Sequence, residues 1–148
     1  MGSPPSTPPL AGRWRRLFAG ILDAIIVSLV ATPFTWTSWQ YVWDADRGIW
    51  ERYPIEHTFV AAVLAFLYFW LFHAYWHGQT PSKKLFHMRV VQVSGRPITV
   101  GQAAIRQLVF AVLAALCCLG IVDLAWILFD PRKQALHDKA AGTLVVDA

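Results

Sequence analysis

The feature that most constrains this chain is an apolar run from Arg16 to about Trp43 that holds a single acid in its first half. Between Leu17 and Phe34 the only charged residue is Asp23. On a helix it would lie about 10 Å from Arg16. A carboxylate at that depth in hydrocarbon is costly unless it is protonated, paired or hydrated. Asp23 is therefore either a structural acid satisfied by a neighbouring helix or by water, or a proton or cation site.

Composition favours an integral membrane protein over a small globular one. Apolar residues make up 56% of the 148 residues, and the mean hydropathy is +0.42. They gather in three segments, at about 17–43, 58–76 and 108–129, as in proteins that lie in a bilayer. We place one membrane domain at 13–148, after a Pro-rich tail, 1–12, that we predict to be disordered. Aromatic clusters near the segment ends are typical of membrane interfaces.

The distribution of charge predicts orientation. Basic residues lie before the first segment and in the loop between the second and third segments, whereas the acids concentrate between the first two. The positive-inside rule then places the N-terminus and the basic loop in the cytoplasm of a multi-pass protein. This loop contains no acid, so we expect it to contact anionic lipid. Without a recognition motif, nucleic acid is not expected as a partner.

Local signals predict several short elements. Thr80 and Pro81 should start a helix that runs through Phe86. Residues 88–93 and 98–100 should pair as a small hairpin, and Thr99 with Gln102 should form a capping box for the next helix. Residues 130–131 should cap an interfacial helix over 132–141, and residues 143–146 could form a short strand.

The third segment leaves two topologies open. Its 22 residues, 108–129, are enough to cross a bilayer, which is the interpretation we favour and which puts the C-terminus outside. A re-entrant hairpin turning near Gly120 would instead return the C-terminus to the cytoplasm. Arg132, Lys133 and Lys139 prefer that side, but acids in the tail balance them.

Arg16 and Asp23 share a helix face but lie too far apart for a direct ion pair. Each needs another partner, and the candidates are Lys83, Arg89, Arg106, His137 and Asp138. We favour a polar clamp that pins the loop and the tail to the helices. The alternative is a carboxylate that exchanges a proton for a cation, with Asp123 as a second ligand.

The sequence does not favour an enzyme, a cofactor or a metal site. His137 and Asp138 are adjacent, so on a helix they point about 100° apart, and no nucleophile motif accompanies them. The Gly78–Lys83 stretch lacks the spacing of a phosphate-binding loop. His73 and His77 have metal-ligand spacing, but no third ligand is near in sequence.

Three stretches resemble the RDD family of small bacterial membrane proteins and together cover nearly everything after residue 12. They are Arg16 with Asp23; Gly78-Gln-Thr-x-x-Lys83 with Arg89-Val-Val and Gly95-x-Pro97; and Asp130-Pro-Arg-Lys-Gln134 with His137-Asp-Lys-x-Ala-Gly-Thr143. The resemblance implies a helical inner-membrane protein whose second family Asp is Asp138, with Asp130 as the alternative. Pro81-Ser82 departs from the family's usual small hydrophobic residue and Gly.

The resulting prediction is an all-α membrane protein with about three transmembrane or re-entrant helices, a short cytoplasmic β-hairpin and an interfacial C-terminal helix. Two functions remain open. Cation/proton exchange is the activity most often proposed for the family, and three segments could perform it only as a homo-oligomer. The alternative is a membrane scaffold or accessory subunit whose Arg/Asp network is structural and whose protein partner the sequence does not identify.

Overall fold

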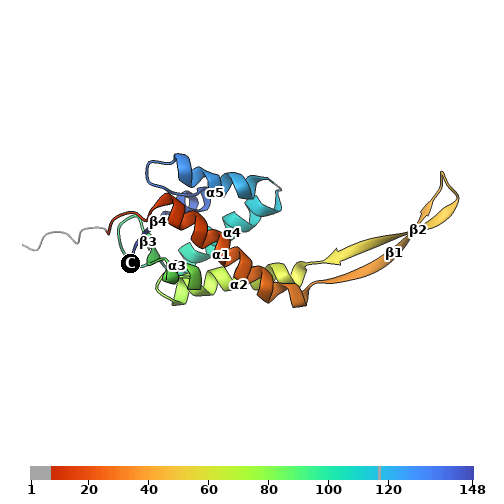
Figure 1. The fold of residues 1–148 in the computed structure, drawn as a ribbon, viewed down its shortest axis with the longest axis horizontal. Coiled ribbons are helices and arrows are strands. Elements are labelled where there is room, and N and C mark those ends of the chain that lie inside the picture. The colour runs from red at the N-terminus through yellow and green to blue at the C-terminus, as the bar shows by residue number, and fades with distance from the viewer. Residues whose placement is uncertain (1–7, 117) are drawn as a thin grey trace, which may run out of the picture.

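The computed structural model describes residues 8–116 and 118–148. The described chain is mostly helical and also contains two small antiparallel sheets, so an all-α class is not confirmed. In Figure 1 the helices form one body, a long hairpin projects from one end, and the C-terminus lies at the other.

The first apolar segment is shorter than expected. Helix α1 spans Arg13–Ala31. A 3-10 turn that contains Pro33, Thr32–Phe34, follows it and ends the helical stretch. The rest of the apolar run, to Trp43, is extended: strand β1, Trp36–Asp44, pairs with β2, Ile49–His57, in full antiparallel register. Branched and aromatic residues favour this extended conformation. The aromatic cluster at 36–53 therefore stands on a hairpin beyond the helices (Figure 1).

Three local predictions are confirmed. Helix α2 spans Phe59–Tyr75 and α3 spans Pro81–Leu85. The Thr80 side chain caps α3 by accepting from the backbone N–H of Lys83. Helix α4 spans Val100–Ala115 and starts with the expected capping box of Thr99 and Gln102.

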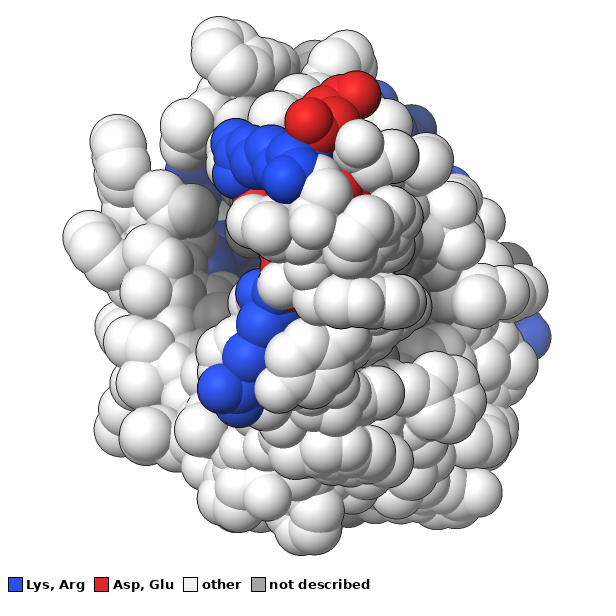
Figure 2. All heavy atoms as spheres, turned by 90° about the vertical axis from the view of Figure 1, so that its right-hand side faces the viewer, with Lys and Arg blue, Asp and Glu red and all other residues white. Residues whose placement is uncertain are grey.

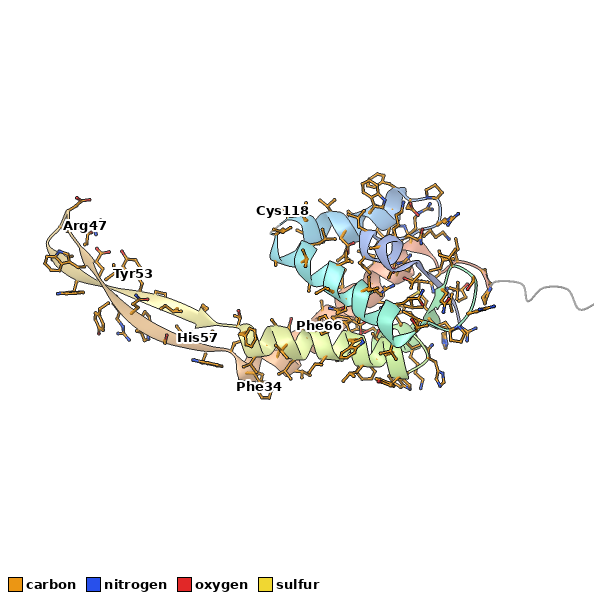
Figure 3. All side chains as sticks on the ribbon, turned by 180° about the vertical axis from the view of Figure 1, so that it is seen from behind. Phe34, Arg47, Tyr53, His57, Phe66 and Cys118 are labelled. Carbon is orange, nitrogen blue, oxygen red and sulfur yellow. The ribbon has the colours of Figure 1, made fainter. Side chains whose placement is uncertain are left out.

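The third apolar segment does not form one continuous span. Helix α4 ends at Ala115 and α5, Leu119–Phe129, folds back against it. A Cβ on Gly120 would lie 3.1 Å from the Cα of Ala114, so a residue without a side chain permits this close approach. The favoured single helix over 108–129 is thus wrong, and the chain turns back near Gly120, as the alternative expected. Figure 3 shows Cys118, in the α4–α5 turn, at the same end of the helical body as Phe34.

The predicted hairpin in the basic loop is also wrong. Strand β3, Met88–Gln92, pairs antiparallel with β4, Thr143–Asp147, and a single bridge, Val91 to Pro97, remains of the local pairing. Pro97 has no N–H to donate to a ladder. The strand predicted at 143–146 is confirmed as β4, which brings the C-terminus to the loop side.

The expected disordered tail, 1–12, is structured where it meets β4. Ala11 donates from its N–H to the carbonyl of Val145 at 3.0 Å, and Asp147 donates to the carbonyl of Pro9 at 2.9 Å. Residues 1–7, the rest of that prediction, lie outside the described part of the chain.

The C-terminal helix is shorter and more buried than predicted. Helix α6 spans Leu136–Ala141 instead of 132–141, because residues 131–135 form an irregular loop in which Lys133 has a φ of 54°. Gly142 ends it in a left-handed conformation, as expected. His137, Asp138 and Ala141 of α6 are buried, so the helix packs into the body instead of lying on its surface.

Polar and apolar residues are arranged inside out in the helical body. Large apolar side chains on the outer faces are exposed, among them Leu29 at 72%, Ile121 at 73% and Phe129 at 80%, and the face seen in Figure 2 is largely uncharged. Charged side chains are buried instead, which is the pattern of a body surrounded by lipid. Within the described chain, Arg13–Phe34 is the one helix long and apolar enough to cross a membrane by length and composition.

Candidate functional site

The buried charges form a network at the end of the body opposite the β1–β2 hairpin, and Asp138 of α6 is its centre. Its side chain is fully buried. Arg16 of α1 donates to Oδ2 at 2.5 Å, and Arg106 of α4 donates to Oδ1. The backbone N–H of Ala135 also donates to Oδ2 at 3.0 Å. One carboxylate therefore ties the first helix, the fourth helix and the tail together.

Asp23 lies in a second part of the network, between α1, α2 and α3, and is fully buried as well. The hydroxyl of Thr80 donates to Oδ2 at 2.5 Å, and the Tyr68 hydroxyl donates to Oδ1 at 3.2 Å. The Lys83 ammonium lies 3.6 Å from Oδ2. Arg16 and Asp23 thus take separate partners, as their spacing predicted. Their ionic partners, Asp138 and Lys83, come from the candidate set, whereas Thr80 and Tyr68 do not.

Asp123 of α5 pairs with His137 of α6. The backbone N–H and the ring Nδ1 of His137 contact the two carboxylate oxygens at 2.9 and 2.5 Å. The His137 Nε2 lies 3.6 Å from Asp138, which links this pair to the centre of the network. In the described part of the chain, Asp123 and Asp23 bind different partners, His137 for the first and Thr80 and Tyr68 for the second.

Two of the named residues lie apart from these contacts. Arg89 is exposed on β3 and is not part of the network. Asp130 closes the loop before α6: its Oδ2 accepts from the N–H groups of Arg132 and Gln134 at 3.0 and 3.1 Å, and Lys139 pairs with its other oxygen. Asp130 is therefore a loop-forming acid, and the structure gives the central position to Asp138.

Three network residues were not identified from the sequence as site residues. Tyr68 was counted among the aromatic residues near the segment ends. Thr80 was assigned to a helix cap and Thr143 to a strand, and both lie in stretches that carry the family resemblance. Thr143 accepts from Arg106 at 3.2 Å. One sequence signal could have identified Tyr68 as a site residue. Its hydroxyl lies within the apolar segment that forms α2, and a polar group in hydrocarbon needs a partner.

The surroundings change the acidity of the network groups outside the long apolar helices. Burial alone would raise the pKa of Asp138, but Arg106 and Arg16 outweigh it and hold the pKa well below the usual value. Burial lowers the pKa of His137, so the imidazole is neutral at pH 7. Burial also lowers the pKa of Lys83 to about 8, although Asp23 opposes the shift.

A cavity of about 300 Å³ adjoins the network. Its polar part is lined by Arg16, His73, Lys83, Arg106 and His137. Its remaining wall is largely apolar and comes from α1, α2, α4 and α5. None of the three buried carboxylates, Asp23, Asp123 and Asp138, is among the lining residues.

Comparison with known proteins identifies relatives over most of the chain. A model of the RDD family matches residues 10–142. The chain is 29% identical to the "Uncharacterized protein YckC" of Bacillus subtilis (strain 168) over 140 residues, which cover 93% of this chain and 85% of that protein. It is 35% identical to the "Uncharacterized protein RP437" of Rickettsia prowazekii (strain Madrid E), over 55% of this chain and 41% of that protein.

A third relative is the "Proline-rich antigen" of Mycobacterium leprae (strain TN), at 32% identity over 55% of this chain and 36% of that protein. The chain thus corresponds to most of the first relative and to less than half of the other two. No solved structure matches it.

Proposed function

The chain belongs to the RDD family, and from this premise we propose that it is a non-enzymatic scaffold or accessory subunit of the bacterial inner membrane. In this role the Arg/Asp network is structural. It fastens the cytoplasmic loop and tail to the membrane helices and so holds a fixed surface for a partner protein.

One observation carries the proposal: all six side-chain oxygens of Asp23, Asp123 and Asp138 accept a hydrogen bond from the protein. A carboxylate that exchanges a cation needs an oxygen that the ion can reach. These three are fully buried and lie behind the cavity wall. Paired, buried carboxylates suit a clamp, because breaking a buried pair is strongly destabilising.

The inside-out arrangement supports a multi-pass placement with α1 and α2 crossing the bilayer. Helix α5 has 11 residues, about 16 Å at 1.5 Å per residue, which is too short to span about 30 Å of hydrocarbon. The α4–α5 pair therefore enters and leaves on one side. The first described residues pair with β4, which lies at the C-terminus, so both described ends of the chain lie at the same end of the body. The positive-inside rule puts this end of the body in the cytoplasm.

Cation/proton exchange by a homo-oligomer is the second candidate, and one observation favours it. Lys83 lines the cavity, lies beside Asp23, and has its pKa lowered to about 8. A group that titrates near physiological pH next to an acid is suited to proton transfer. In that mechanism Asp23 would exchange the ion, with Arg16 adjusting its affinity.

Proteoliposomes that hold a pH gradient separate the two functions. Na⁺, K⁺ or Li⁺ is added to vesicles containing the wild type or Asp23→Asn, and proton flux is followed with a pH-sensitive dye. The scaffold proposal expects no cation-dependent collapse of the gradient with either protein. Collapse with folded wild type that disappears in Asp23→Asn would overturn it in favour of exchange.

A further inference from the structure

The cavity beside the network has basic side chains at one end and an apolar wall over the rest. Three cationic residues, Arg16, Lys83 and Arg106, and two histidines, His73 and His137, line it, and of the described residues that line it none is acidic. The acids that pair with the three cations contact them from behind the wall. The open side of the basic cluster is therefore suited to an anion.

Two buried polar atoms at this end have no partner within the described part of the chain. Arg16 is 7% exposed and uses Nη2 for Asp138, which leaves Nη1 without an acceptor. His73 is 2% exposed; its Nδ1 contacts the carbonyl of Phe69, and its Nε2 is unsatisfied. Both side chains line the cavity. Nη1 of Arg16 is a buried donor without a partner, which is costly, so an acceptor that reaches it would stabilise the protein. Nδ1 of His73 carries the ring proton because it contacts a carbonyl, so Nε2 of the uncharged ring is an acceptor and not a donor.

The apolar wall extends from this basic end along α1. Arg16, Gly20, Ala24, Val27 and Ser28 line the cavity from one helix face, a stretch of about 18 Å at 1.5 Å per residue. Opposite it lie aromatic and aliphatic side chains of the other helices: Phe69, Phe110, Leu124 and Ile127. A free inorganic anion would make no use of this wall, whereas an acyl chain would.

We propose that this cavity binds one anionic phospholipid of the cytoplasmic leaflet, with its phosphate at Arg16 and part of one acyl chain along α1. The guanidinium matches phosphate oxygens in charge and geometry. The cavity volume of about 300 Å³ suits a headgroup phosphate and the first part of a chain, at the lower end of ligand-pocket sizes. The basic end lies at the level of the network, where the proposed topology places the cytoplasmic interface.

This inference rests on the proposed membrane placement and not on the role of the Asp23 network. Retention of the full chain in the membrane fraction after alkaline carbonate extraction checks that placement first. Release by carbonate would overturn the placement and the lipid inference together. A flux result that favours exchange would overturn the scaffold and leave the lipid inference standing.

Gly20 allows the cavity to be filled without touching the network. A Cβ built on Gly20 meets no atom within 4 Å, and the same holds for Gly101 in the first turn of α4, outside the cavity. Gly20→Phe should fill the cavity, and Gly101→Phe is the matched control, with the same substitution and the same gain in helix propensity.

The measurement is native mass spectrometry and thermal unfolding of the delipidated full chain in detergent. The protein is mixed with phosphatidylglycerol, with phosphatidylcholine that has the same acyl chains, or with inorganic phosphate. We expect one phosphatidylglycerol per chain with a raised unfolding midpoint, an affinity about tenfold lower in Gly20→Phe, and no change in Gly101→Phe.

Equal phosphatidylglycerol binding by Gly20→Phe would place the lipid elsewhere, for example on the basic loop, and would overturn the proposal. Equal binding of phosphatidylcholine would remove the role of the anionic charge and would also overturn it. Saturation by inorganic phosphate alone would make the ligand a free anion instead of a lipid. Absence of any lipid retention by folded wild type would contradict the proposal directly.

Discussion

The buried network and the β1–β2 hairpin contain ion pairs of the same length in opposite surroundings. Arg16 and Asp138 approach to 2.5 Å with side chains that are 4% and 0% exposed. Arg47 and Glu51 also approach to 2.5 Å, but their side chains are 68% and 24% exposed. Water screens the second pair and not the first. Distance alone therefore does not measure what an ion pair contributes.

The two regions also differ in how they are held. The network joins α1, α3, α4, α5 and α6 through contacts between residues far apart in sequence. The hairpin is held by its own ladder and by cross-strand pairs, such as Trp43 with Trp50 at 5.5 Å between ring centroids. Figure 3 shows Arg47 and Tyr53 on the projecting part of the hairpin, away from the helices. A substitution in the hairpin should therefore disturb the hairpin alone, whereas a substitution in the network should lower the stability of the whole helical body.

Asp138→Asn should have the largest effect. The substitution keeps the shape of the side chain but leaves the guanidinium groups of Arg16 and Arg106 buried without a carboxylate. We expect a loss of about 3–5 kcal/mol in the free energy of unfolding, measured by SDS titration in mixed micelles. Asp147→Asn is the control, because its pair with Arg15 is 38–42% exposed and should contribute less than about 1 kcal/mol. Equal losses would remove the distinction between buried and exposed pairs.

Thr80→Val should have the next largest effect. The hydroxyl of Thr80 both caps α3 and donates to buried Asp23 at 2.5 Å. Losing the cap costs about 1 kcal/mol, and losing a hydrogen bond to a charged group adds about 1.5 kcal/mol or more.

Thr99→Val is the matched substitution, because Thr99 caps α4 through the same type of contact. Its partners, the backbone N–H and side chain of Gln102, are uncharged. We expect about 1 kcal/mol from the lost cap. If the two variants unfold at the same SDS fraction, the contact with Asp23 contributes nothing measurable.

Acid should weaken the network through His137 before it affects Asp138. Because burial lowers the pKa of His137 below its ordinary value of 6.5, the unfolded state binds the proton more readily. The free energy of unfolding then falls as pH drops below about 6.5, by at most about 1.4 kcal/mol per pH unit. The pKa of Asp138 is lowered as well, but for an acid this favours the charged form in the folded protein. The contribution of Asp138 therefore persists until the pH falls below the usual aspartate pKa of 3.8.

Thermal unfolding between pH 7.5 and 5 measures this dependence. His137→Asn should flatten the profile, because it removes the titrating ring and keeps a donor towards Asp123. A wild-type midpoint that does not change over this range would show that His137 gains its proton as easily in the folded protein as in the unfolded chain.

Glu51→Gln should have the smallest effect. It removes the ion pair with Arg47 near the tip of the hairpin, where solvent screens both groups. We expect a change of less than about 0.5 kcal/mol in the free energy of unfolding. Hydrogen exchange of the β1–β2 amides should increase while that of α1 and α4 stays the same. Increased exchange throughout the helices would show that the hairpin supports the body.

Sequence reasoning succeeded where the determining contacts are local. The caps at Thr80 and Thr99 and the end of α6 at Gly142 all depend on residues within a few positions of each other. The family resemblance is confirmed by the match over residues 10–142. It had also suggested Asp138 as the family's second acid, and the structure places that side chain against Arg16.

The failures arise where distant contacts override local preference. The 88–93 strand could pair with 98–100 nearby, but β4, more than fifty residues away, offers a full ladder without a proline. Apart from Asp123 the segment 108–129 is apolar, which conceals the turn between α4 and α5; Gly120 and the basic residues that follow the segment were the indications. No local pattern indicates which buried acid takes which base, because that choice is made by packing.

Strand β4 has a consequence for the order in which the protein is made. It lies between β3 and the residues that precede α1, so the beginning and the middle of the chain gain their common partner only after residue 147 has left the ribosome. Until then Arg16 and Arg106, already synthesised, have no Asp138 to neutralise them. The nascent chain must keep both guanidinium groups hydrated until then. Closure of the network end of the body is therefore a late step in biogenesis, and a ribosome stalled before Asp138 would hold an unclosed protein.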